Sequence, residues 1–161
     1  MVKIRTLLDE VIAFLQSKTE LAGVDISAGP TGLNDIKDIG IQPPAIIVFV
    51  QPDVSDQPNF DGFSPYTNAL VTIFTCCSAE TPQYAALDSV DLAFVVENLI
   101  WTDEALRNYL DSLDADIVEG ATPKNANIYP HKIEYGEKVT YDDYYSDFAS
   151  SYLSLKITIA K

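Results

Sequence analysis

The most apolar segment in the middle of the chain is Ala69-Leu70-Val71-Thr72-Ile73-Phe74-Thr75-Cys76-Cys77, and the other elements are best understood from it. Its β-branched and aromatic residues supply apolar side chains to both faces of an extended segment, a pattern typical of a central strand. Thr81-Pro82 then predicts a helix start, because threonine can accept a hydrogen bond from a free amide and proline's fixed φ suits the first helical position. We expect this helix to continue for about five turns, to Ile100 or Trp101.

The predicted helix has no continuous polar face. At about 100° per residue its apolar side chains fall on three sides: Leu87, Val90 and Phe94 on one, Leu92, Val95 and Leu99 on another, and Ala86, Ala93 and Ile100 on a third. A helix that is apolar nearly all round must be covered on more than one side, and a chain of 161 residues has few other elements to cover it. The pattern therefore indicates subunit association.

Three further segments precede the central strand. An amphipathic helix that packs on a sheet is predicted at the N-terminus, from the spacing of Ile4, Leu7, Leu8, Val11, Ile12 and Leu15. The turn-rich connection 23–40 leaves room for a short strand, and the apolar run 45–50 predicts a strand covered on both faces. Residues 51–65 carry four proline and glycine residues (Pro52, Pro58, Gly62 and Pro65), and we expect them to form a long hairpin tip between two adjacent strands.

After the long helix, Thr102-Asp103-Glu104 predicts the start of a second, short helix at an angle to the first. Its apolar stripe consists of Leu106, Tyr109, Leu110 and Leu113. Segments 128–135 and 152–159 are predicted as the last two strands. The whole chain, 1–161, is therefore expected to form one α+β, two-layer domain, in which a mixed, mostly antiparallel sheet carries the N-terminal helix and the long central helix on one face.

Composition places the chain among globular proteins, with 47% hydrophobic and 21% charged residues. Its net charge is −14, and no lysine or arginine lies between Asp38 and Leu106. Such a surface disfavours binding of nucleic acid through a basic patch. It suits either plain solubility or a face past which DNA slides without sticking.

No apolar run approaches the length of a membrane span. Asp9 and Glu10 interrupt the apolar region that a secretory signal would need near the N-terminus, so we expect assembly in a cytoplasm.

Few residues suggest chemistry. His131 is the only histidine and has no serine or cysteine motif around it. Cys76 and Cys77 are neighbours in a predicted strand, so they should point to opposite faces as buried, reduced thiols. The Asp142-Asp143 pair with Asp147 lacks the glycine and terminal glutamate of an EF-hand and is interpreted as a solvated acidic loop. We therefore expect no catalytic residue, no metal and no cofactor.

Tyrosines gather in the same acidic segment, as Tyr141, Tyr144 and Tyr145, with Tyr152 nearby. Aromatic side chains that combine an apolar body with a polar tip are favoured at protein interfaces. Ordinary packing over a sheet edge is the alternative interpretation.

The order of elements resembles that of the phage tail terminator, or tail completion, proteins, including minor tail proteins of contractile-tailed phages. The resemblance depends on Pro43-Pro44 with the run 45–50, on the strand 70–75 that leads through Ala79-Glu80-Thr81 into the long helix, and on the two closing strands. It covers nearly the whole chain as an order of elements.

The resemblance implies a structural virion protein that forms a hexameric ring, caps the tail tube, ends tube polymerisation and joins the tube to the neck or head connector. Its partners would be further copies of itself, the tail tube protein and the neck proteins, while DNA passes through without specific binding. The surfaces expected to contact these partners are the hairpin loop, the long helix and the tyrosine segment: Asp53, Asp56, Phe60, Asp61, Phe63, Leu92, Val95, Val96, Leu99, Tyr141, Asp142, Tyr144 and Tyr145.

Two other classes of function stay open. An acidic cytoplasmic binding module, inhibitor-like or immunity-like, would mask a basic partner through Asp53, Asp56, Asp61 and the tyrosine–aspartate segment, with strongly salt-dependent binding. An enzyme would require a pocket with a perturbed carboxylate or His131.

Overall fold

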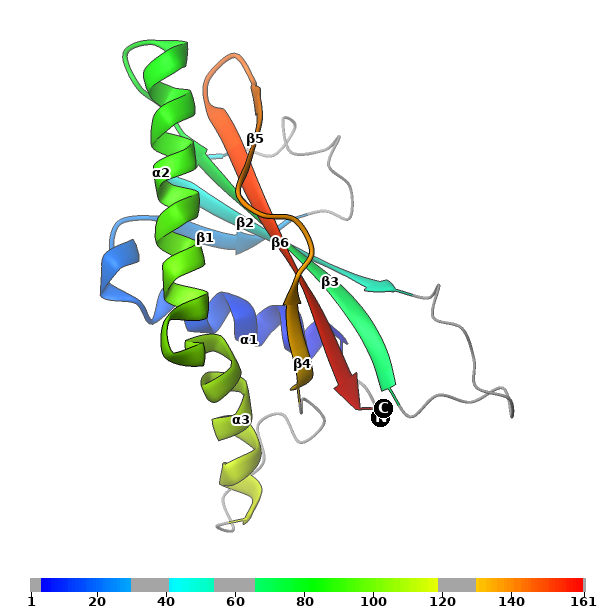
Figure 1. Ribbon diagram of the computed structural model, residues 1–161. Helices are drawn as coiled ribbons and strands as arrows, with labels where there is room; N and C mark the ends of the chain where they lie inside the picture. The colour runs from blue at the N-terminus through cyan, green and yellow to red at the C-terminus, as the bar shows by residue number, and fades with distance from the viewer. Residues whose placement is uncertain (1–3, 30–40, 54–65, 119–129, 161) are drawn as a thin grey trace.

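A computed structural model of the chain describes residues 4–29, 41–53, 66–118 and 130–160. In chain order its elements are α1 (Ile4–Gln16), the 3-10 turn η1 (Thr19–Leu21), β1 (Asp25–Ala28), β2 (Ala45–Asp53), β3 (Tyr66–Cys77), α2 (Pro82–Trp101), the 3-10 turn η3 (Thr102–Glu104), α3 (Ala105–Val118), β4 (Pro130–Tyr135), β5 (Thr140–Tyr144) and β6 (Ala149–Ala160). Figure 1 shows α1, α2 and α3 on one face of the sheet. The predicted α+β fold is confirmed.

The six strands described form one mixed sheet in the order β1-β2-β3-β6-β4, with β5 also paired to β6. β1 runs parallel to β2, and the other pairs are antiparallel. β3 lies in the middle, where Ile73 is opposite Val48 on one side and Leu153 on the other. The predicted adjacency of β2 and β3 is therefore confirmed, while the loop between them, 54–65, lies outside the described residues.

The main core lies between the helices and one face of the sheet. A sheet face offers alternate residues, so β3 contributes Val71 and Ile73 and β6 contributes Leu153 and Leu155, all fully buried. The helices cover these strands with buried residues at helical spacing: Leu7, Val11, Phe14 and Leu15 from α1, Ala93, Val96 and Ile100 from α2, and Leu106, Leu110 and Leu113 from α3. The predicted apolar stripes of the N-terminal and the second helix are confirmed.

The opposite face of the sheet carries a smaller buried cluster: Ala45, Ile47, Phe49, Phe74, Cys76 and Phe148. Phe49 and Phe74 meet edge to face, with ring centroids 5.3 Å apart. Both faces of β2 and β3 are thus covered, as their continuous apolar runs predict. Cys76 belongs to this cluster and Cys77 follows it on the strand, so the two side chains leave the strand on opposite faces, and both are free, buried thiols as predicted.

The long helix α2 begins and ends on local signals. The Thr81 side chain accepts a hydrogen bond from the Tyr84 amide at 3.2 Å, and Pro82 occupies the first helical position. The helix ends at Trp101, and the next residues turn the chain into α3 with two left-handed residues, Asp103 (φ 55°) and Glu104 (φ 53°).

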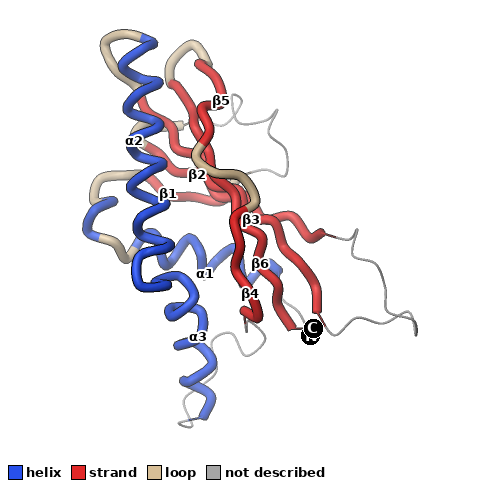
Figure 2. The backbone as a smooth tube through the Cα atoms, viewed as in Figure 1, coloured by secondary structure: helices blue, strands red, loops and turns tan. Residues whose placement is uncertain are grey.

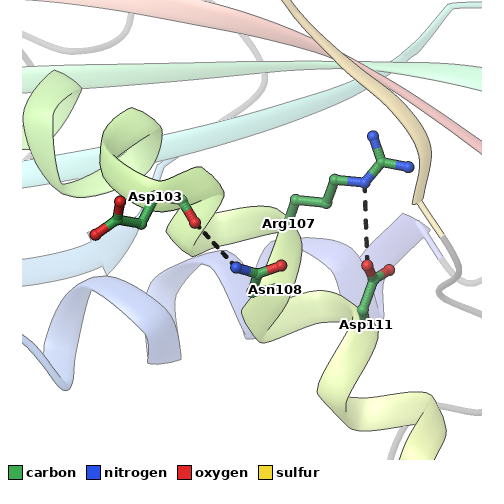
Figure 3. Close-up of polar contacts among 4 residues, drawn as sticks. All are labelled: Asp103, Arg107, Asn108 and Asp111. Atoms are coloured by element: carbon green, nitrogen blue, oxygen red, sulfur yellow. Dashed lines mark hydrogen bonds and ion pairs between the residues drawn. The ribbon is translucent and has the colours of Figure 1, made fainter.

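The turn between α2 and α3 is held by one side chain of the second helix. The Asn108 amide nitrogen donates to the Asp103 carbonyl oxygen at 2.9 Å, as Figure 3 shows. Arg107 and Asp111 also approach each other, with 3.9 Å between nitrogen and oxygen, but both are well exposed and such pairs contribute little to stability. The predicted second helix at an angle is therefore confirmed.

One predicted loop is a strand. Residues Thr140–Tyr144 form β5, paired with the first part of β6, where we expected a solvated acidic loop. Aspartate has a low preference for strands, yet the edge position leaves both Asp142 and Asp143 in contact with solvent while β6 supplies the backbone partners.

Candidate protein-binding surface

The row of α2 that faces the sheet consists of small and buried residues: Ala85, Ser89, Ala93, Val96 and Ile100. Three hydroxyl groups lie where this row meets β3 and β6. Thr75 Oγ1 donates to the Ser89 carbonyl oxygen at 2.7 Å, and the Ser89 and Ser151 hydroxyl oxygens are 2.7 Å apart. Because these side chains are short, the helix approaches the strands closely and its rotation about its own axis is set.

The two flanks of α2 therefore face different neighbours. Trp101 stacks on Tyr135 of β4, with ring centroids 4.5 Å apart, so the flank that carries Trp101 faces the β4–β5 edge of the sheet. Phe94 and Leu87 precede Trp101 by seven and fourteen residues and lie on the same flank, since seven residues make about two helical turns. Both remain about half exposed, Leu87 at 53% and Phe94 at 48%.

The β5 strand adds two tyrosines to the same side of the sheet. Tyr141 is opposite Ser151, and Tyr144 is opposite Ala149, two β6 residues that share the face of the sheet covered by α2. An irregularity between Tyr141 and Asp143 makes this possible, because in a regular strand residues three apart would face opposite sides. Figures 1 and 2 show β5 beside the N-terminal half of α2.

Among the described residues, the large apolar side chains with high exposure all belong to α2 or to the β4–β5 edge: Tyr84, Leu87, Phe94, Tyr135, Tyr141 and Tyr144. We call this set the edge surface. Isolated exposed apolar residues are normal on a protein, but a set gathered on adjacent elements is typical of an interaction site. The edge surface is the candidate functional site of the chain.

Carboxylates of α2 border the edge surface: Asp88, Asp91 and Glu97, in a helix without lysine or arginine. On β5, Asp143 is opposite Ser150 and Asp142 accepts a hydrogen bond from Tyr145, so both aspartates lie towards the far face of the sheet. Burial, followed by the charge and hydrogen bond of Glu97, raises the pKa of Tyr135, and burial together with Asp143 and Asp142 raises the pKa of Tyr141.

The basic residues of β4 lie on the other side of the sheet. Ile133 and Tyr135 alternate with Lys132 and Glu134, and these two form an ion pair at 2.8 Å. Because Ile133 packs in the helix-side core, Lys132 and Glu134 face away from α2. Between Lys132 and Lys156 the sequence has one further basic residue, Lys138, in the connection between β4 and β5.

Two other tyrosines of the predicted cluster pack on the far face of the sheet. Tyr145 and Tyr152 lie partly buried against the smaller core, and the rings of Tyr152 and Phe74 meet at a tilt, with centroids 5.4 Å apart. The Tyr145 hydroxyl donates to Asp142 at 2.5 Å, and the Tyr152 hydroxyl donates to a Glu137 oxygen at 2.7 Å.

These neighbours also shift the titration of the two tyrosines. Burial and the bond to Asp142 raise the pKa of Tyr145, and the bond to Glu137, with burial, raises that of Tyr152. Tyr145 and Tyr152 are therefore packed over the sheet, whereas Tyr141 and Tyr144 are exposed, and the role of these two at an interface stays a prediction.

The α2 residues that were predicted as interface residues lie outside the edge surface. Leu92, Val95 and Leu99 are partly buried on the flank opposite to Trp101, and Val95 and Leu99 help to line a cleft of about 470 Å³ with Lys18, Glu20, Asn98, Thr102 and Ala105. Val96 has no exposed surface, since it belongs to the sheet-facing row, and its prediction as an interface residue is corrected. Asp53 ends β2, and Asp56, Phe60, Asp61 and Phe63 lie outside the described residues.

Sequence reasoning placed Leu87 and Phe94 on one side of the helix but did not select them, and it missed Tyr84 and Tyr135. The available signal was the row of small residues at spacing four, Ala85, Ser89 and Ala93, which marks the side of α2 that packs closely on the sheet. From this row, the side of α2 that carries Leu87 and Phe94 can be identified as the exposed side.

Groups that could support chemistry are separated in the structure. Within the described ranges, no three histidine, cysteine, aspartate or glutamate side chains are placed to hold a metal ion. Burial raises the pKa of Cys76 to about 12 and that of Cys77 to about 11, with Asp88 and Asp91 adding to the second shift, so neither thiol is a nucleophile near neutral pH. His131 lies in β4.

No described helix has the length and apolar character needed to cross a membrane.

Comparisons with protein-family models and with curated proteins found no match for this chain.

Proposed function

We propose that this chain is a structural virion protein of the tail terminator type. In this proposal, copies of the chain form a hexameric ring that caps the phage tail tube, ends its polymerisation and joins it to the neck or head connector. Such a function requires no catalytic residue. It requires a rigid domain, an arm that reaches a neighbouring copy, and surfaces for at least two kinds of partner.

The base of the long β2–β3 hairpin is the observation that carries the proposal. The ladder runs without interruption from the pair Ala45 and Cys76 to the pair Asp53 and Asn68. Figure 1 shows these ends of β2 and β3 on the side of the sheet away from α2. Residues 54–65 lie outside the described residues; the sequence predicts them as a hairpin tip, which we call the arm. We propose that the arm contacts the next subunit through Phe60 and Phe63.

The flank of α2 formed by Leu92, Val95 and Leu99 offers the second subunit contact. These side chains pack only partly against the core, and Val95 and Leu99 border the cleft next to Lys18 and Glu20. An arm from a neighbouring copy could fill this cleft and bury the flank. Such a contact is heterologous, since different surfaces of two copies meet, and heterologous contacts generate a ring when the rotation between successive copies closes.

The test is the mass of the purified protein, measured by native mass spectrometry and light scattering over a range of concentration and salt, with negative-stain images. The proposal expects a closed hexamer with a central hole. It also expects the variant Phe60→Ser/Phe63→Ser to lose the ring. The variant Ser78→Ala, a substitution of an exposed residue at the other end of β3, is the control and should keep the ring.

A monomer at every concentration that also fails to bind purified tail tubes would contradict the proposal. That result would favour the acidic binding module, whose binding to a basic protein should weaken steeply as salt rises. If the Phe60→Ser/Phe63→Ser variant still forms a ring, the proposed ring function stands, but the proposed contact through the arm is contradicted.

A further inference from the structure

The edge surface combines two properties that together restrict what can bind it. Its centre consists of the half-exposed Leu87 and Phe94 on α2 and of Tyr135, Tyr141 and Tyr144 at the sheet edge. Apolar and aromatic side chains at the centre of a patch supply most of the affinity of a protein interface. The sheet side of this surface carries no charged residue from β4, because Lys132 and Glu134 alternate to the other face.

The charges that α2 places around this centre have one sign, while the basic side chains nearby lie at its ends: Arg107 of α3 beside Trp101, and Lys138 in the β4–β5 connection. Asp91 lies four residues after Leu87 and three before Phe94, so its carboxylate is next to both on the helix. Asp88 is one turn from Tyr84 and one turn from Leu92, so it lies at the margin of the surface, while Glu97 acts on Tyr135 from the other side. Asp88 and Asp91 are exposed, and α2 and β5 contain no basic residue that would neutralise them.

We propose that the edge surface binds an apolar segment of another protein whose flanks carry lysine or arginine. Complementary charge around an apolar centre speeds association and selects the partner. A second copy of this chain meeting the same surface through a twofold axis would bring identical carboxylates together, in a chain of net charge −14, and like charges would oppose the contact.

Strand addition to β5 is a different mode, and the strand is poorly suited to it. Its register is interrupted between Tyr141 and Asp143, and aspartates occupy its centre. Both features are devices that protect sheet edges from further pairing. The partner is therefore expected to pack on side chains of the edge surface rather than to extend the sheet. This inference does not rest on the ring, because a monomer would present the same surface.

The probe for this proposal is a synthetic amphipathic helical peptide with leucine and phenylalanine on one face and lysine on the other. A second peptide replaces every lysine with glutamate. Calorimetry with the full chain should show saturable one-to-one binding of the lysine peptide and none of the glutamate peptide. Amide chemical shifts should change on α2 around Leu87 and Phe94 and on β5, and the affinity should fall as salt rises.

Two double variants locate the binding. Leu87→Ser/Phe94→Ser removes the apolar centre. Asp88→Asn/Asp91→Asn removes one exposed charge beside the centre and one at its margin. Each double variant should weaken binding of the lysine peptide by about tenfold. Asp9→Asn/Asp25→Asn removes two exposed charges from α1 and β1 and changes the net charge equally, so it is the matched control and should leave the affinity unchanged. Thermal unfolding of each variant checks that the fold is retained.

Several outcomes would overturn the proposal. Equal weakening by the two aspartate variants would mean that the peptide senses only the net charge. Absence of binding, or shift changes confined to another face, would exclude the edge surface. If Leu87→Ser/Phe94→Ser instead lowers the mass of the assembly in solution, the molecule that binds the edge surface is a second copy of this chain. The mass of the assembly and the affinity for the peptide are measured on the same samples. A failure of the ring proposal therefore appears in the mass, and a failure of the present proposal appears in the affinity.

Discussion

The hydroxyl oxygen of Ser89 on α2 lies 2.7 Å from that of Ser151 on β6. Ser89 Oγ also lies 2.8 Å from the Ala86 carbonyl oxygen, to which it donates. A hydroxyl has a single proton to donate, so Ser151 is the donor of the serine pair. With both residues fully buried, this contact joins the long helix to the middle of the sheet and sets which flank of α2 faces the edge strands.

We predict that the two serines are energetically coupled. Ser89→Ala should lower the free energy of unfolding by about 1 to 3 kcal/mol, because the buried Ser151 hydroxyl loses its acceptor. Ser89→Ala/Ser151→Ala should cost less than the sum of the single variants, since neither leaves an orphaned partner behind. Urea unfolding of the four proteins measures this. Ser112→Ala is the exposed control, expected within about 0.5 kcal/mol of the parent; strictly additive costs would contradict the coupling.

The turn between α2 and α3 stores backbone strain that glycine should relieve. Glu104 has φ 53°, a left-handed conformation that costs an ordinary L-residue about 1 to 2 kcal/mol. Glu104→Gly should therefore raise the free energy of unfolding by about 0.5 kcal/mol, the gain being reduced by the larger chain entropy of glycine in the unfolded state.

The neighbouring residue provides the control for this prediction. Ala105 has φ −60° and packs against the core, so Ala105→Gly should destabilise the protein by about 1 kcal/mol. Urea midpoints of the two variants should move in opposite directions. Destabilisation by both would show that the Glu104 side chain contributes more than its backbone strain costs.

Much of the fold could be predicted because its signals are local. The start of α2 follows from Thr81 and Pro82, and its end follows from the new helix start expected at Thr102-Asp103-Glu104. The strands β2 and β3 follow from apolar runs that only a doubly covered strand can bury. The α3 stripe follows from helical spacing in the same way.

The candidate site could not be predicted in the same way, because the rotation of α2 is a tertiary property. With apolar residues on three sides, hydrophobicity does not distinguish Val96, which is buried, from Leu87 and Phe94, which are exposed. The rotation of α2 about its own axis is set by the packing of its small residues against β3 and β6. The strand β5 was missed for a related reason: its aspartates disfavour a strand, and pairing with β6 outweighs this preference.

The connection between β4 and β5 depends on a glycine. A Cβ at Gly136 would lie 2.4 Å from Ser154 Oγ and 3.2 Å from Leu70 Cδ1. The Ser154 hydroxyl accepts a hydrogen bond from the Glu137 amide at 2.6 Å, so it cannot move without losing that bond. Gly136→Ala should therefore lower the free energy of unfolding by about 1 to 3 kcal/mol.

Removal of the clashing oxygen tests the cause. Gly136→Ala/Ser154→Ala should cost less than the two single variants together, because the remaining neighbours of the new Cβ lie at 3.2 Å and 3.3 Å. The four proteins are compared by thermal unfolding. A neutral Gly136→Ala, or a double variant as poor as the sum, would show that the steric conflict is not the reason for glycine here.

Alkaline pH should destabilise the protein through groups that are buried in their neutral form. Burial raises the pKa of the Cys76 thiol from 9.0 to about 12, and burial with the bond to Glu10 raises the pKa of Tyr109 from 10.0 to about 12. The Tyr109 hydroxyl donates to Glu10 Oε2 at 2.7 Å, a bond that needs the proton. A raised pKa in the folded state means that the unfolded chain loses its proton first.

The stabilisation from these groups is therefore complete below pH 9 for the thiol and below pH 10 for the tyrosine, and it is lost as the pH rises towards 12. Urea unfolding under reducing conditions should give a free energy that falls steadily over this range. Tyr109→Phe should be less stable at pH 8, because the bond to Glu10 is gone, but its stability should fall less steeply above pH 10. An unchanged slope in Tyr109→Phe would exclude the bond with Glu10 as a cause of the alkaline loss.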